Sequence, residues 1–102
     1  MADYLFLFYG DMMPTTPAEQ KKSMDAWMGW FGKLGSAVVN PGAPTKPGKI
    51  VRKAGARAIG ANPVTGYTVV KAKTLEAAVT MAKGCPDIPQ GVQVAIYEII
   101  PM

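Results

Sequence analysis

Histidine is absent from this 102-residue sequence, and cysteine occurs once, as Cys85. Because histidine and cysteine are the usual ligands of transition metals, one copy of the chain cannot assemble such a metal site, and an intramolecular disulfide is excluded. A lone thiol suits a reducing cytoplasm. Cys85 follows Gly84, where a predicted helix ends, and the dipole at that helix end disfavours a thiolate, so we do not expect a nucleophile. No catalytic motif stands elsewhere, so the sequence indicates neither a metal nor a cofactor, and it does not by itself identify a function.

Long hydrophobic runs are also missing. The longest uninterrupted apolar stretch covers residues 5–9, whereas a transmembrane helix needs about 20 residues. The N-terminus has no basic region followed by an apolar signal core. We therefore expect a cytoplasmic protein with no membrane partner. The composition, 49% hydrophobic and 18% charged, is that of a globular chain, and residues 1–102 fit a single domain.

Acidic residues are missing from one basic stretch. The formal net charge is only +4, but residues 46–57 contain Lys46, Lys49, Arg52, Lys53 and Arg57 with no acid among them. These cations either bind an anion or form a solvated loop and hairpin edge, where lysine also protects strands from aggregation. No aromatic residue interleaves the stretch and no RNA-binding or helix-turn-helix signature is present, so we do not expect a nucleic-acid partner.

The order of apolar runs and caps predicts the elements β, α, β, β, α, β. Strands are expected at residues 4–9, 36–40, 66–72 and 92–100, with a weak strand or hairpin arm at 49–59. Thr16, Pro17 and Glu19 form a capping signature for a helix that ends at Gly35. Thr74 caps a second helix, which ends near Gly84.

The first predicted strand is apolar on both sides. Tyr4, Phe6 and Phe8 alternate along it with Leu5, Leu7 and Tyr9. Two helices in a domain of this size cover one face of the sheet, so the other face needs a partner. A second identical sheet is the simplest partner, and a small domain also gains stability by association, so we expect a homodimer.

Apolar residues at helical spacing define the inner face expected for each helix. In the first helix these residues are Met24, Trp27, Met28, Phe31 and Leu34, and in the second they are Leu75, Ala78, Val79 and Ala82. Trp30 lies partly off the first stripe, where it either lines a pocket or subunit contact or extends the core; the core interpretation is favoured because tryptophan is generally buried.

Four segments resemble the YCII-related family, also described through its DGPF motif: LFLFYGD at residues 5–11, FGKLGSAVV at 31–39, GYTVVKAKTLEAAVTMAKGCP at 66–86, and the closing strand. The resemblance implies a ferredoxin-like βαββαβ fold of the α+β class, with an antiparallel sheet, in which two subunits form a dimeric α+β barrel. Some members use a His and Asp pair, and this chain has no histidine, so that chemistry does not carry over. The DGPF segment is also absent, and residues 61–64 read Ala-Asn-Pro-Val nearby.

The sequence and the resemblance suggest two functions of different classes and a third, accessory role. The first is a homodimeric barrel that binds a small, largely apolar molecule, with Tyr9, Trp27, Trp30, Arg52 and Tyr67 as candidate binding residues. The second is a cofactor-independent enzyme acting on a small carbonyl or aromatic compound, with Asp11 as a general base beside Tyr9 or Tyr67, and with Arg52 or Arg57 holding an anionic group. The favoured explanation of Asp11 is, however, a turn residue that bonds nearby amides. The third is an accessory protein whose barrel is filled with side chains.

Overall fold

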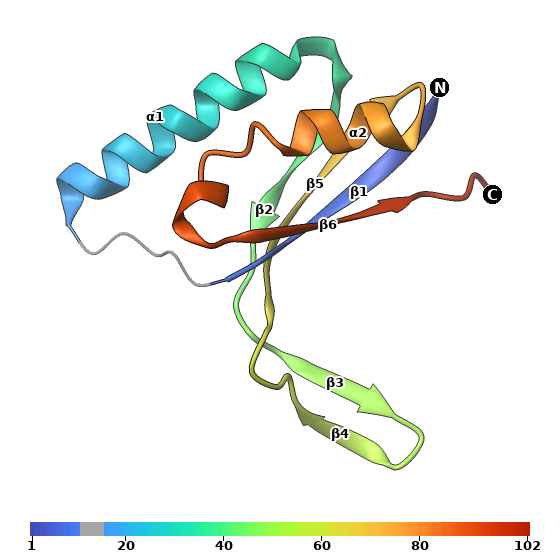
Figure 1. The fold of residues 1–102 in the computed structure, drawn as a ribbon. Coiled ribbons are helices and arrows are strands. Elements are labelled where there is room, and N and C mark those ends of the chain that lie inside the picture. Colours follow the sequence, from blue (N-terminus) through green and yellow to red (C-terminus); the bar gives the residue numbers. More distant parts are fainter. Residues whose placement is uncertain (11–15) are drawn as a thin grey trace.

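A computed structural model describes residues 1–10 and 16–102. The strands are β1 (Ala2–Tyr9), β2 (Val38–Pro44), β3 (Lys49–Arg52), β4 (Gly55–Ala58), β5 (Val64–Ala72) and β6 (Gln93–Glu98), and the helices are α1 (Pro17–Leu34) and α2 (Leu75–Ala82), with short 3₁₀ turns at Gly35–Ala37 and Ile88–Gln90. Four strands form an antiparallel sheet in the order β2-β5-β1-β6, and both helices lie on one of its faces (Figure 1). The fold is α+β and compatible with a ferredoxin-like topology. The predicted element order is confirmed, and β3 and β4 form a separate hairpin inserted between β2 and β5.

Strand β1 lies in the middle of the sheet and organises the core. Tyr4, Phe6 and Phe8 point towards the helices and are buried, together with Val70 on the neighbouring strand β5. Trp30 of α1 packs over them, with its ring centroid 6.3 Å from that of Phe6. The predicted alternation of β1 is therefore confirmed on its helix side.

Helix α1 begins and ends where the sequence predicts. The Thr16 side chain accepts a hydrogen bond from the amide of Glu19 at 3.1 Å, and Gly35 ends the helix with a φ of +56°. The predicted inner stripe is only partly right, because Met24 and Met28 are about 65% exposed while Trp30 is buried. The inward residues are Trp27, Trp30, Phe31 and Leu34. Their i, i+3, i+4, i+7 spacing centres the buried stripe about a quarter turn from Met28.

Strand β2 differs from its prediction. Residues 35–37 form a 3₁₀ turn instead of strand, and the strand then continues through Pro41 to Pro44. A sheet edge tolerates proline, because the missing amide would have faced solvent, and β2 is an edge strand. Gly42 has a φ of +74°, and a Cβ there would lie 1.8 Å from the carbonyl oxygen of Tyr67. The close approach of β2 to β5 at this point therefore requires glycine.

The second half of the chain agrees with the prediction in outline. The Thr74 side chain caps α2 by accepting from the amide of Ala77, and Ala78 and Ala82 of the predicted inner stripe are buried. The prediction was wrong for Leu75, which is 47% exposed. On β6, Tyr97 and Glu98 point to opposite faces, as expected from alternation. None of the helices in the described ranges has the length and apolar character needed to span a membrane.

Candidate functional site

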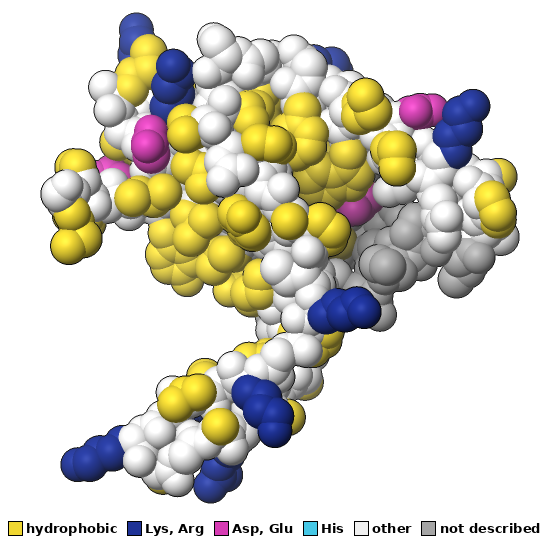
Figure 2. All heavy atoms as spheres, turned by 180° about the vertical axis from the view of Figure 1, so that it is seen from behind, with side chains coloured by type: hydrophobic (Ala, Val, Ile, Leu, Met, Phe, Trp, Pro, Cys, Tyr) yellow, Lys and Arg dark blue, Asp and Glu magenta, His cyan; other side chains and the backbone are white. Residues whose placement is uncertain are grey.

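One face of the sheet is covered by no element among the residues that the structure describes. The cross-strand pairs show which side chains share it, because Leu5 lies opposite Val69 and Tyr97, and Leu7 lies opposite Tyr67 and Ala95. We call this surface the open face; its apolar members are Leu5, Leu7, Tyr9, Ala43, Tyr67, Val69, Ala95 and Tyr97. Tyr97 is 55% exposed. Viewed from behind, hydrophobic side chains gather over the sheet on this side (Figure 2).

Two rows of paired side chains cross the open face from β2 through β5 and β1 to β6. One row runs Ala43, Tyr67, Leu7, Ala95, and the other runs Asn40, Val69, Leu5, Tyr97. In the first row the two central side chains are large and the two edge side chains are small, so that row is high in the middle and low at both edges. Asp3 and Lys71 lie opposite each other at one end of β1. The open face is therefore apolar at its centre and charged at that end.

The opposite, helix-covered side is closed. The indole nitrogen of Trp30 donates to the carbonyl oxygen of Met81 at 3.0 Å, and that of Trp27 donates to Oδ2 of Asp87 at 3.1 Å. The buried Thr68 hydroxyl donates to the carbonyl oxygen of Pro41 at 3.0 Å. Across residues 1–10 and 16–102, every buried side-chain nitrogen and oxygen has a hydrogen-bond partner. Among the described residues, the packed interior of this side therefore has no unpaired side-chain polar atom for a ligand.

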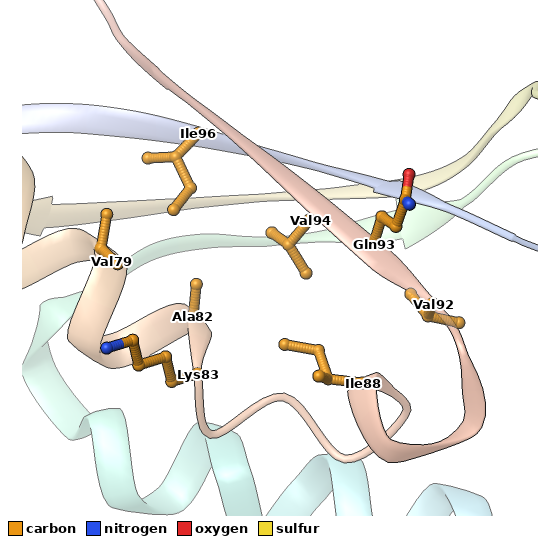
Figure 3. A pocket seen from close by; sticks show the side chains of 8 residues that line it. All are labelled: Val79, Ala82, Lys83, Ile88, Val92, Gln93, Val94 and Ile96. Carbon is orange, nitrogen blue, oxygen red and sulfur yellow. The ribbon is translucent and has the colours of Figure 1, made fainter.

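A shallow groove on the helix side lies between α2 and β6 (Figure 3). Its volume is about 300 Å³ and its walls are Val79, Ala82, Lys83, Ile88, Val92, Gln93, Val94 and Ile96. The Gln93 amide points away from the apolar centre of the groove (Figure 3). Only Lys83 brings a charge to the rim, so the groove offers an apolar surface but no pair of groups for acid–base work.

The predicted binding residues do not form one cluster within the subunit. Tyr9 and Tyr67 lie on the open face, whereas Trp27 and Trp30 belong to the core on the other side of the sheet. Arg52 lies on the β3–β4 hairpin, away from both groups (Figure 1). The predicted general base, Asp11, lies outside the described residues. The core interpretation of Trp30 is confirmed, so the predicted set divides into two tyrosines on the open face and two tryptophans on the helix side.

Sequence reasoning did not single out Leu5, Leu7 and Val69 as site residues. Alternation in β1 marks Leu5 and Leu7, and it supports the predictions of both a dimer and an apolar ligand. Their neighbours on the face follow from strand register, which the sequence does not specify.

Among the described residues, two side chains have raised pKa values. Burial, with a contribution from the neighbouring Glu98 carboxylate, raises the pKa of the Tyr4 phenol, whose hydroxyl donates to Oε1 of Glu98 at 3.3 Å. Burial raises the pKa of the Cys85 thiol, which is 2% exposed. The sequence predicted that Cys85 is not a nucleophile because it lies at the end of a helix. In the structure, burial of the thiol is the larger reason to expect this.

The hairpin formed by β3 and β4 extends from the end of the sheet (Figure 1). Residues 49–58 are exposed along their whole length. Cationic side chains mark its surface, at the lower end of the view from behind (Figure 2). The predicted hairpin arm is confirmed, and we call residues 49–58 the arm.

Comparison with known proteins adds no assignment: no model of a protein family matches the chain, and a search of curated protein sequences returns no significant match.

Proposed function

We propose that this chain forms a homodimer through the open face and binds a small, largely apolar molecule between the two sheets, as a divergent YCII-related protein that works without histidine chemistry. The observation that carries the proposal is the open face itself. Leu5, Leu7 and Val69 occupy the centre of a sheet whose other side is fully packed. An apolar surface of this kind on a monomer marks an interaction site.

A second copy is the occupant that fits this face best. A two-fold axis places the same apolar rows against each other, so the surface is its own complement. Two sheets packed face to face lie about 10 Å apart, and the side chains between them fill that gap. The row through Tyr67 and Leu7 is tall in the middle, and Ala43 and Ala95 leave room at its edges. Space for a small molecule therefore arises beside the central contacts.

The chemistry of this space favours an apolar ligand. The open face carries the phenols of Tyr9, Tyr67 and Tyr97 and the amides of Asn40 and Gln93, which donate or accept hydrogen bonds. The charged pair Asp3 and Lys71 lies at one end of the face. A ligand bound there gains most of its affinity from buried apolar surface and its orientation from a phenol.

The proposal is tested with two neutral probes, 1-octanol and indole, by isothermal titration calorimetry of the purified protein. We expect saturable binding to the wild type and none to the monomeric variant Leu7→Lys. Met28→Lys is the matched control, because Met28 is 65% exposed on α1, outside the open face, and it should bind as the wild type does. Failure of both probes to bind, or equal binding to Leu7→Lys, would reject the proposed site.

A further inference from the structure

The two edges of the sheet differ in how they resist pairing with another strand. The β2 edge is interrupted, because Pro41 and Pro44 have no amide hydrogen and the register with β5 shifts twice along the strand. At the other edge (Figure 1), β6 reads Gln-Val-Ala-Ile-Tyr-Glu and its register with β1 is regular. Prolines, lysines and bulges are the usual protection of a sheet edge, and β6 contains none of the three. The β6 edge is therefore the one that accepts a further strand.

The backbone of β6 offers hydrogen-bonding groups along this edge. The Ile99 amide donates to the carbonyl oxygen of Asp3 at 2.8 Å, so the odd-numbered residues 93–99 turn their backbone groups towards β1. Val94, Ile96 and Glu98 consequently turn their amides and carbonyls outwards, where no other strand of the described structure pairs with them. Outward groups of this kind are a template for a strand of another chain.

The side chains of the same strand form one wall of the groove between α2 and β6. Val94 and Ile96 project into this groove, and Val79 and Ala82 of α2 line its other side (Figure 3). A strand added beside β6 brings every second side chain over this apolar surface, with Lys83 at the rim. The groove therefore fits an extended chain that has apolar residues at alternate positions and an acid beside Lys83.

The end of this chain carries that pattern itself. Glu98 lies on the helix side of the sheet, because it pairs with the buried Tyr4. Alternation places Ile96 and Ile100 on the same side. Ile100 is 77% exposed in the subunit. A second copy of the chain thus supplies both the strand and the acid that the edge and its groove require.

We infer that the β6 strands of two copies pair antiparallel about a two-fold axis at Ile96 and join the two sheets edge to edge. In this register Val94 of one copy lies opposite Glu98 of the other, so the three outward residues pair with one another. The carboxylate of Glu98 then lies over the groove of the other copy, on the side where Lys83 forms the rim. Opposite charges meet twice, once on each side of the axis. Ile100 continues along the same groove.

This contact is separate from the open face. It joins strands in the plane of the sheet, whereas the proposed dimer stacks one sheet on another, so the two contacts use different surfaces. A strand edge covers less apolar surface than the open face, and we therefore expect the edge contact at higher protein concentration. The contact needs no ligand and does not rest on the proposed function.

The contact is tested by sedimentation velocity of Leu7→Lys, in which the lysine blocks the open face and β6 is unchanged. We expect this variant to dimerise at high protein concentration. Adding Ile100→Asp should raise the dissociation constant by about tenfold or more, because Ile100 is largely exposed in the subunit and is covered only in the pair. Met28→Asp adds the same charge on α1 and should leave the constant unchanged. A Leu7→Lys protein that stays monomeric would overturn the inference and leave the edge to a strand of another protein, and an unchanged constant with Ile100→Asp would also overturn it.

Charge reversal in the same Leu7→Lys background tests the register. Lys83→Glu and Glu98→Lys should each raise the dissociation constant about fivefold or more, because each replaces two attractions by two repulsions, and K83E/E98K should restore it. Contact within one subunit does not explain such a rescue, since Val94, which shares the groove with Lys83, is four residues or about 13 Å from Glu98 along β6. Lys22→Glu on α1 is the control and should change nothing.

Failure of K83E/E98K to restore the constant, or an unchanged constant for Lys83→Glu, would refute the pairing at Ile96. Glu98→Lys also loses the hydrogen bond from the Tyr4 hydroxyl. Because Lys83 is exposed, Lys83→Glu decides the question by itself if the Glu98 variants do not fold.

Discussion

Replacing Leu7 with lysine perturbs the centre of the open face. Leu7 lies on the central strand β1, between Tyr67 of β5 and Ala95 of β6. Its side chain points away from the packed core formed by Phe6 and Phe8. A lysine there extends into solvent in a single subunit, so the fold of the subunit should survive while the association of two copies is weakened.

The expected change in the dimer dissociation constant follows from the additional burial of Leu7 in the dimer. Leu7 is only partly exposed in the subunit, so at most about a third of the ~2 kcal/mol for complete burial of leucine, roughly 0.7 kcal/mol, remains to be gained in a dimer. A two-fold interface contains this side chain twice, and losing both removes at most about 1.4 kcal/mol, which is about tenfold in the dissociation constant. Desolvation of two ammonium groups adds to this cost, so we expect the dissociation constant to rise by about tenfold or more.

Sedimentation velocity over a range of concentrations measures the constant directly, with far-ultraviolet circular dichroism to confirm that the variant is folded. Met28→Lys introduces the same charge on α1 and should sediment as the wild type does. A wild-type protein that remains monomeric at high concentration, or a folded Leu7→Lys dimer with an unchanged constant, would refute the assignment of the open face.

Three further predictions concern the subunit itself. Trp30→Ala should lower the free energy of unfolding by about 3 to 5 kcal/mol in urea titrations, because it empties the core, whereas Met28→Ala at an exposed site should change it by less than about 0.5 kcal/mol. Gly42→Ala should lower it by at least about 1 to 3 kcal/mol, because alanine resists a φ of +74° and its Cβ would lie 1.8 Å from the Tyr67 carbonyl oxygen; wild-type stability would exclude this account. Burial raises the pKa of the Cys85 thiol, so the thiol of the unfolded state loses its proton at a lower pH than the thiol of the folded state. The free energy of unfolding should therefore fall as the pH rises above about 8.5. Urea titrations across this range should show a smaller fall in Cys85→Ala than in the wild type, and an equal fall in both proteins would contradict the prediction.

The parts of the fold that the sequence predicted are those governed by local rules. Thr16 and Thr74 cap helices through hydrogen bonds to amides three residues on, and these contacts depend only on neighbouring residues. The two apolar sides of β1 follow from strict alternation and do not depend on register. Both kinds of signal lie within a few residues of chain, and both predictions were confirmed.

The predictions that were wrong concern features that depend on contacts between residues distant in sequence. Met28 and Trp30 both continue a helical apolar pattern, and only the position of α1 over Phe6 and Phe8 makes Trp30 the inward residue. Pro41 looked like a strand end, but its place at the sheet edge lets β2 continue past it. The candidate site residues were assembled by residue type, and strand register separates Tyr67 from Trp27 by the thickness of the sheet.

The contrast between the two faces of the sheet links ligand binding to association. A ligand inside the aromatic core on the helix side would displace the indoles of Trp27 and Trp30, which already have hydrogen-bond partners, and would leave those partners unpaired. A ligand between two open faces displaces only water from apolar surface. If it binds there, it binds the dimer and not the monomer, so by mass action it must also strengthen association. Measured together, the dissociation constant of the dimer should fall as the concentration of a bound probe rises, and a constant that is independent of the probe would place the ligand outside the interface.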